Sequence, residues 1–271
     1  MADFYWDLAP FVAICLALIG LVYWWGWRRD RAEEREHVNA LAALADSLGG
    51  KSVVGRSESR AWSADLLPPM KTATEGFFGW LGTIRQPRFE TAVDFQRGEW
   101  SVRVSEASVK QHVVTAGATI SYEHRIEVAT SPLPATRICK RVYPESRRTW
   151  LFKNVQVVGP AGEPPLTAER DQQQWLRVVL PEALDREFTV FSTDPATVRR
   201  MFTPQVVEWM LDRTGSPGTS AMPFALTFEA GFAYTVEHGR IAPDLLLPQV
   251  DAILGLLDRM RAAPAHPPAP V

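Results

Sequence analysis

The sequence predicts an α+β fold, in which an N-terminal single transmembrane helix is followed by a mostly antiparallel β-sheet body with flanking helices. Three observations predict it: an uncharged run near the start, runs in the middle that alternate apolar and polar residues, and helical-period runs before and after these. The expected segments are a tail and transmembrane helix over 1–27, a juxtamembrane helix over 28–50, a β-rich subdomain over 51–158, an α+β subdomain over 159–262 and a disordered tail over 263–271.

The predicted transmembrane helix covers residues 8–27, LAPFVAICLALIGLVYWWGW, which hold no charged residue. A run of this length matches the roughly 30 Å hydrocarbon core of a bilayer. Arg28, Arg29 and Arg31 follow at once, whereas residues 1–7 contain no Lys or Arg. Because Lys and Arg favour the cytoplasmic side, we expect the N-terminus outside and a cytoplasmic body at the inner (plasma) membrane of a bacterial-type cell.

Within that run, Ala9, Ala13 and Ala17 recur every four residues. Such stripes of small residues let two helices approach closely. The expected partners are therefore the lipid bilayer and either a partner protein or a second copy of the chain that packs on this stripe. The alternative is that alanine is simply common in helices of this kind.

Composition excludes some classes of function. All 29 Lys and Arg lie after the apolar run, as do 29 of the 31 Asp and Glu, since only Asp3 and Asp7 precede it. The body is thus formally neutral, which argues against binding of nucleic acid. Cys15 and Cys139 cannot plausibly pair, because one lies in the apolar run and the other in a strand-like run. No His or Cys spacing is typical of a metal site, and we expect no cofactor.

Alternating patterns predict the strands. Residues 88–95 (RFETAVDF) and 100–106 (WSVRVSE) form a hairpin turning at Gly98, and 224–237 (FALTFEAGFAYTVE) form another turning near Ala230 and Gly231. Residues 118–129 (ATISYEHRIEVA) predict one apolar and one solvated face. The expected apolar face is Ile120, Tyr122, His124, Ile126 and Val128, and the expected solvated face is Ser121, Glu123, Arg125 and Glu127.

Capping residues predict the helix boundaries. Gly49 and Gly50 end the helix that starts at residue 28, Asp194 or Thr193 with Pro195 begins one helix, and Thr203 with Pro204 begins the next. A last helix is expected over 248–261.

The run FTVFSTDPATVRRMFTP, residues 188–204, resembles a family of uncharacterised bacterial membrane-anchored proteins with a domain of unknown function. Asp194, Pro195, Arg199, Thr203 and Pro204 carry the resemblance, which covers about half the chain together with looser likeness in the stalk and early strands. It implies an anchored cytoplasmic α+β body, and it assigns no activity and no functional residue.

Residues that could bind phosphate or catalyse a reaction are better explained by roles in the fold. Residues 45–52 (ADSLGGKS) match a relaxed phosphate-loop pattern, but a helix precedes them where a strand is required, so a helix stop is favoured. His124 is expected to be a core or edge histidine rather than a base. A hydrolytic site would require convergence of strand-end carboxylates, Asp94, Glu99, Glu106, Asp185 and Glu187.

Two surface clusters have alternative interpretations. Phe77, Phe78 and Trp80 either contact the membrane interface, together with Arg28, Arg29 and Arg31, or plug the core. A basic set either faces anionic lipid or forms a solvated rim: Arg137, Lys140, Arg141, Arg147 and Arg148.

The sequence therefore predicts a membrane-tethered interaction or scaffold protein that is not an enzyme. The alternatives are a membrane-bound hydrolase whose site has no recognisable motif, and a lipid-surface accessory of an envelope complex. A contiguous exposed apolar patch would favour the interaction protein.

Overall fold

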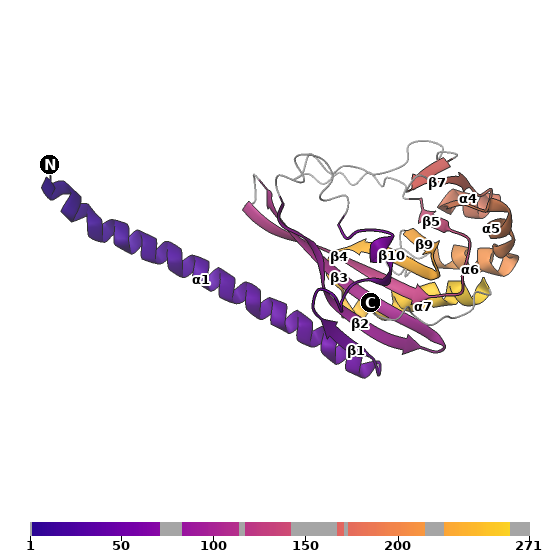
Figure 1. Cartoon of the computed structure of the whole chain (residues 1–271), viewed down its shortest axis with the longest axis horizontal. Helices are drawn as coiled ribbons and strands as arrows, with labels where there is room; N and C mark the ends of the chain where they lie inside the picture. The colour runs from indigo at the N-terminus through magenta and orange to yellow at the C-terminus, as the bar shows by residue number, and fades with distance from the viewer. Residues whose placement is uncertain are drawn as a thin grey trace. The chain divides into compact units, whose positions relative to one another are not determined.

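The computed structural model describes residues 2–70, 83–113, 117–141, 167–170, 173–214 and 225–260. The chain divides into two units, 1–44 and 45–271 (Figure 1). The first is helical, and the second, called the body below, contains the sheet. The subdomain boundary expected near residue 159 and the tail expected to be disordered, 263–271, lie outside the described residues.

The first unit belongs to one helix, α1, which runs from Ala2 to Ser47 without interruption. Across the described residues, no helix is both long enough and apolar enough to cross a membrane. The predicted N-terminal transmembrane helix, residues 8–27, is therefore wrong, and so is the single-pass membrane description. The apolar run does not form a helix of its own. It is part of α1, which continues through the charged residues that follow the run. The expected localisation and orientation stay predictions.

The helix ends where two glycines were expected to end it. Gly49 has a φ of 65°, a left-handed conformation that glycine adopts without strain. A Cβ on Gly50 would lie 2.3 Å from the Asp94 carbonyl oxygen, so this position tolerates no side chain. The residues that resemble a phosphate loop thus end a helix and lead into strand β1, Lys51–Val54.

The body is built on a ten-stranded sheet with the order β1-β2-β3-β4-β10-β9-β5-β8-β7-β6. Every described pairing is antiparallel. The remaining strands are β2 (Thr83–Arg97), β3 (Trp100–Val113), β4 (Gly117–Ala129), β5 (Thr136–Lys140), β6 (Thr167–Arg170), β7 (Gln173–Arg177), β8 (Phe188–Ser192), β9 (Ala225–Glu229) and β10 (Phe232–His238).

Both predicted hairpins are confirmed. Gly98 turns β2 into β3 with a φ of 62°, and Ala230 and Gly231 turn β9 into β10 with φ values of 50° and 81°. The second hairpin lies between β4 and β5, so late residues of the chain fill the centre of the sheet.

One face of the sheet is covered by helix α7, Pro243–Arg259. Its buried residues repeat with a helical period and include Leu246, Val250, Ile253 and Leu257. Polar groups fix its position: Gln249 Nε2 donates to Glu237 at 3.0 Å, and the Trp100 indole donates to Asp258 at 3.0 Å.

The opposite face of β4 differs from the expectation. Glu123, Arg125 and Glu127, expected to be solvated, are only 5%, 0% and 0% exposed. The reason is segment 55–70, including the 3-10 helix η1 (Trp62–Asp65), which covers them and hydrogen-bonds to their charges. The predicted division into an apolar and a solvated face is therefore wrong for this strand.

Three short helices gather at the end of the sheet formed by β5, β8 and β7 (Figure 1). They are α4 (Glu182–Glu187), α5 (Pro195–Met201) and α6 (Pro204–Thr214). As predicted, Asp194 caps α5: its carboxylate accepts the Thr197 N–H at 3.0 Å, and Pro195 occupies the first turn. Thr203 does the same for α6, accepting the Val206 N–H at 3.4 Å.

Candidate functional site

The residues predicted for membrane contact are not brought together by the described structure. Phe77, Phe78 and Trp80 lie outside the described residues. In α1, Arg29 pairs with Glu33 at 2.8 Å, and the Arg28 guanidinium lies 5.4 Å from the centre of the Trp24 ring. Arg31 is in α1 as well, and of the alanine stripe only the exposed Ala17 has a described side chain.

Three of the five carboxylates proposed for a hydrolytic site have separate structural partners, whereas Glu99 lies at the β2–β3 turn and Glu187 at the end of α4. Asp94 pairs with Arg103 at 2.6 Å, and Glu106, on the other face of the sheet, accepts the Ile241 N–H at 2.9 Å. Asp185 lies in α4 and pairs with Arg177 at 2.6 Å. Within the described ranges, no group of three or more His, Cys, Asp or Glu is arranged to hold a metal ion.

His124 is a core histidine, as expected. Its side chain is buried, and Nδ1 lies 3.0 Å from the Gly239 carbonyl oxygen. Together with the bond from Ile241 to Glu106, this contact fixes the turn before α7 to the sheet. His124 therefore holds the fold together at this point.

The basic set expected near residues 137–148 is partly paired. Arg141 contacts Asp185 and Thr189, and Arg147 and Arg148 lie outside the described residues. The neighbouring Cys139 thiol has a pKa raised by burial, against the opposing effect of Arg137. A thiol with a raised pKa is mostly protonated at neutral pH and hence a poor nucleophile.

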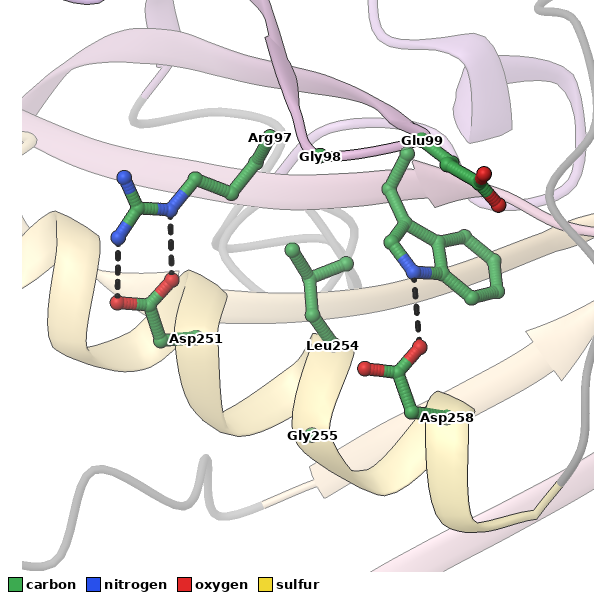
Figure 2. A pocket seen from close by; sticks show the side chains of 8 residues that line it. Arg97, Gly98, Glu99, Asp251, Leu254, Gly255 and Asp258 are labelled. Atoms are coloured by element: carbon green, nitrogen blue, oxygen red, sulfur yellow. Dashed lines mark hydrogen bonds and ion pairs between the residues drawn. The ribbon is translucent and has the colours of Figure 1, made fainter.

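Among the described residues of the body, two hollows bear on function. The first, of about 540 Å³, lies between the β2–β3 turn and α7 (Figure 2). Arg97 and Asp251 pair through two hydrogen bonds of 2.9 and 3.0 Å, and the Trp100 indole donates to Asp258. These two pairs join the β2–β3 hairpin to α7 across the hollow. We therefore interpret this hollow as a structural contact between the hairpin and the helix.

The second hollow, of about 640 Å³, has a different character and is called the α6 groove below. Its lining is Pro181, Phe202, Pro204, Val207, Glu208, Leu211 and Asp212. The apolar members form its surface, while the two acidic residues are exposed. Small-ligand and peptide sites are commonly of this composition, mostly apolar with a few polar groups.

Local structure positions each side of the α6 groove. Phe202 lies between α5 and α6, next to Thr203, and the caps at Asp194 and Thr203 fix the first turn of each helix. Pro181 precedes α4, and its carbonyl oxygen accepts the Leu184 N–H at 2.9 Å. The groove is thus formed by one side of α6 together with Pro181 and Phe202, which flank α4 and α5.

On α6, residues four apart form parallel rows. Val206 and Met210 are fully buried in the core, whereas Val207 and Leu211, one position further on, are half-buried along the groove. Glu208 and Asp212 form an acidic row beside them. An apolar strip bordered by negative charge is therefore presented to the outside.

Exposed apolar residues also occur in the chain segment that precedes Pro181. Val179, two residues before Pro181, is 68% exposed, and Leu176 in β7 is 47% exposed.

Sequence reasoning missed the α6 groove. The pattern of apolar residues in 203–211 predicts a helix with an apolar face, but it does not show which apolar residues are left over after packing. Pro181, which completes the groove, comes from a distant part of the chain. The sequence does contain one signal of an exposed apolar row: Glu208 and Asp212 lie four residues apart, next to Val207 and Leu211.

Comparison with protein-family models, with curated proteins and with solved structures finds no match for this chain. The resemblance carried by residues 188–204 stays a prediction.

Proposed function

We propose that this protein is an interaction or scaffold protein whose body binds an apolar, basic segment of a partner protein in the α6 groove. The observation that carries the proposal is the apolar strip of Val207 and Leu211 beside Pro181 and Phe202, with Glu208 and Asp212 along it. Apolar side chains of a partner would replace water on the strip, and Lys or Arg would face the acids.

Two features of the described residues support binding over catalysis at this position. The groove lining contains no His, Cys or Ser, and its ionisable members are the two exposed acids. In addition, the buried charges of the body are engaged in holding the fold, as Glu106 and Glu127 illustrate.

The size of the groove sets the expected strength of binding. Fully burying one Leu or Val side chain contributes about 1.5–3 kcal/mol, so two anchoring side chains contribute about 3–6 kcal/mol before the cost of association. Since the cost of association is subtracted from this contribution, we expect the Kd of a short segment to be no tighter than about 10⁻⁴ M. A scaffold that exchanges partners is compatible with binding of this strength.

The test is selection of peptides from a multivalent display library on the purified protein, because avidity makes weak binding detectable. We expect enrichment of peptides that combine apolar residues with Lys or Arg. Their binding should be lost on Leu211→Asp, and it should weaken on the double variant Glu208→Lys and Asp212→Lys.

Leu245→Asp is the matched control, because Leu245 is an exposed leucine of α7 that does not line the groove. Urea unfolding checks that all variants are folded. Peptides that bind the wild type and Leu211→Asp equally, or a failure to enrich any peptide, would contradict the proposal.

A further inference from the structure

The last turn of α7 lies against the helix that carries the α6 groove. A Cβ on Gly255 would lie 2.9 Å from Trp209 Cζ2, and the Arg259 guanidinium lies 5.1 Å from the centre of the Trp209 ring. Trp209 is in the same turn of α6 as Val207, Glu208 and Leu211. Helix α7 therefore ends beside α6, on the side of α6 opposite to Val207 and Leu211.

Residues 261–271, RAAPAHPPAPV, have the chemistry that the groove requires. They contain no acidic residue, one arginine and one histidine, and their remaining side chains are Ala, Pro and Val. Pro264 and Pro267 have the spacing PxxP, which is recognised in apolar and aromatic grooves by its preformed extended helix. Arg261 is complementary in charge to Glu208 and Asp212.

The length of this segment is sufficient. An extended proline helix rises about 3.1 Å per residue, so residues 261–271 reach about 34 Å. An α-helix with its side chains is about 10–12 Å across. The segment can thus pass around α6 from the Trp209 side and lie along the groove.

We infer that residues 261–271 are an intramolecular ligand of the α6 groove and compete with the partner for it. The inference rests on the proposed function, because it names a regulator of the same site. A tethered segment acts at an effective concentration in the millimolar range, so it occupies the groove even when its own Kd is near 10⁻³ M. A partner must then displace it, which lowers the apparent affinity of the full chain.

The test compares two full-length proteins, the wild type and a segment variant with Arg261→Glu, Pro264→Gly and Pro267→Gly. A fluorescein-labelled peptide with the sequence of residues 261–271 is added to each, and fluorescence anisotropy gives its Kd. We expect binding to the segment variant to be tighter than to the wild type, because the tethered competitor has been removed: about 2-fold at an effective concentration of about 1 mM and about 10-fold at about 10 mM. Adding Leu211→Asp to the segment variant should abolish binding, and adding Leu245→Asp should not.

Equal affinity of the peptide for the wild type and the segment variant would overturn the inference, as would absence of binding to both. These outcomes are separate from failure of the proposed function. If library-selected peptides bind the groove while the 261–271 peptide does not, the groove is an interaction site without an internal ligand. If neither binds, both proposals fail.

Discussion

Charged side chains of β4 hold segment 55–70 on the sheet. Glu127 accepts the N–H groups of Trp62 and Ser63 at 2.8 and 2.7 Å, and Glu123 accepts that of Met70 at 2.9 Å. Between them, Arg125 donates to the Leu67 carbonyl oxygen at 2.6 Å. A buried charge is tolerated only with such partners. The burial of these β4 charges therefore requires segment 55–70, and the charges in turn hold the segment in place.

Burial raises the pKa of Glu127 above its ordinary value of 4.5, against the opposing effects of Ser63, Trp62 and Arg125. A carboxyl with a raised pKa binds its proton more strongly in the folded state than in the unfolded state. Its stabilising contribution is therefore complete below about pH 4.5 and is lost as the pH rises through the folded-state pKa.

Glu127→Gln removes this titration and leaves one of the two N–H donors facing an amide NH₂. We expect the variant to be less stable than the wild type, by a margin that shrinks between about pH 5 and about pH 8. Urea unfolding at both pH values measures the margin, and Glu182→Gln at an exposed position is the control. If the stability difference between wild type and variant grows with pH instead, the hydrogen bonds to Glu127 affect its pKa more than burial does.

Arg125→Met should cost about 3–5 kcal/mol in the free energy of unfolding, because it leaves the Glu123 carboxylate buried without its cation. Arg97→Met, which breaks an exposed pair, should cost about 0–1 kcal/mol. Replacing Glu123 by Met as well should recover part of the loss. Equal costs for the two arginine variants would show that Arg125 is not shielded from water.

The sequence predicts β4 as a strand, because its apolar residues alternate, but it does not predict that both faces are covered. Charged residues normally remain solvated, and the donors that satisfy Glu123 and Glu127 are backbone N–H groups, which any sequence provides. The alternating signs of Glu123, Arg125 and Glu127 are the available signal for a paired row.

At the level of elements, α6 and α7 meet where Gly255 faces Trp209. Arg213 and Arg259 also contact the Trp209 ring, at 4.6 and 5.1 Å from its centre. The absence of a side chain at residue 255 lets the indole approach the backbone of α7. This contact fixes α6, and with it the orientation of the groove.

Gly255→Ala should destabilise the protein in the wild-type background, because overpacking costs about 1–3 kcal/mol. In a Trp209→Leu background the same change should stabilise by up to about 1 kcal/mol, since alanine favours the helix. Thermal unfolding of the four proteins measures the effect. Stabilisation in both backgrounds would show that the two helices do not meet at this contact.

Element boundaries were predictable where local chemistry decides them. Asp194 and Pro195, Thr203 and Pro204, and Gly98 and Gly231 act through their own backbone neighbours, and the structure confirms each. The α6 groove was not predictable, because it depends on which apolar rows remain after α6 packs on its neighbours. The start of the last helix also lies earlier than expected, at Pro243.

At the level of the whole molecule, the body combines a continuous antiparallel sheet with a groove along α6. The predicted transmembrane helix is wrong, because no helix among the described residues is long and apolar enough to cross a membrane. The order of the sheet was not predictable either, since the β9–β10 hairpin pairs with β4 and β5 across long stretches of chain. What remains of the functional prediction is the interaction role, and it depends on the α6 groove.

Site-specific crosslinking in cells tests this role most directly. A benzoylphenylalanine placed at Val207 should give a discrete crosslinked species on irradiation, which Leu211→Asp removes. The same group at Leu245 should give none. A crosslink of equal yield at Val207 and Leu245, or one unaffected by Leu211→Asp, would contradict a partner-binding role for the groove.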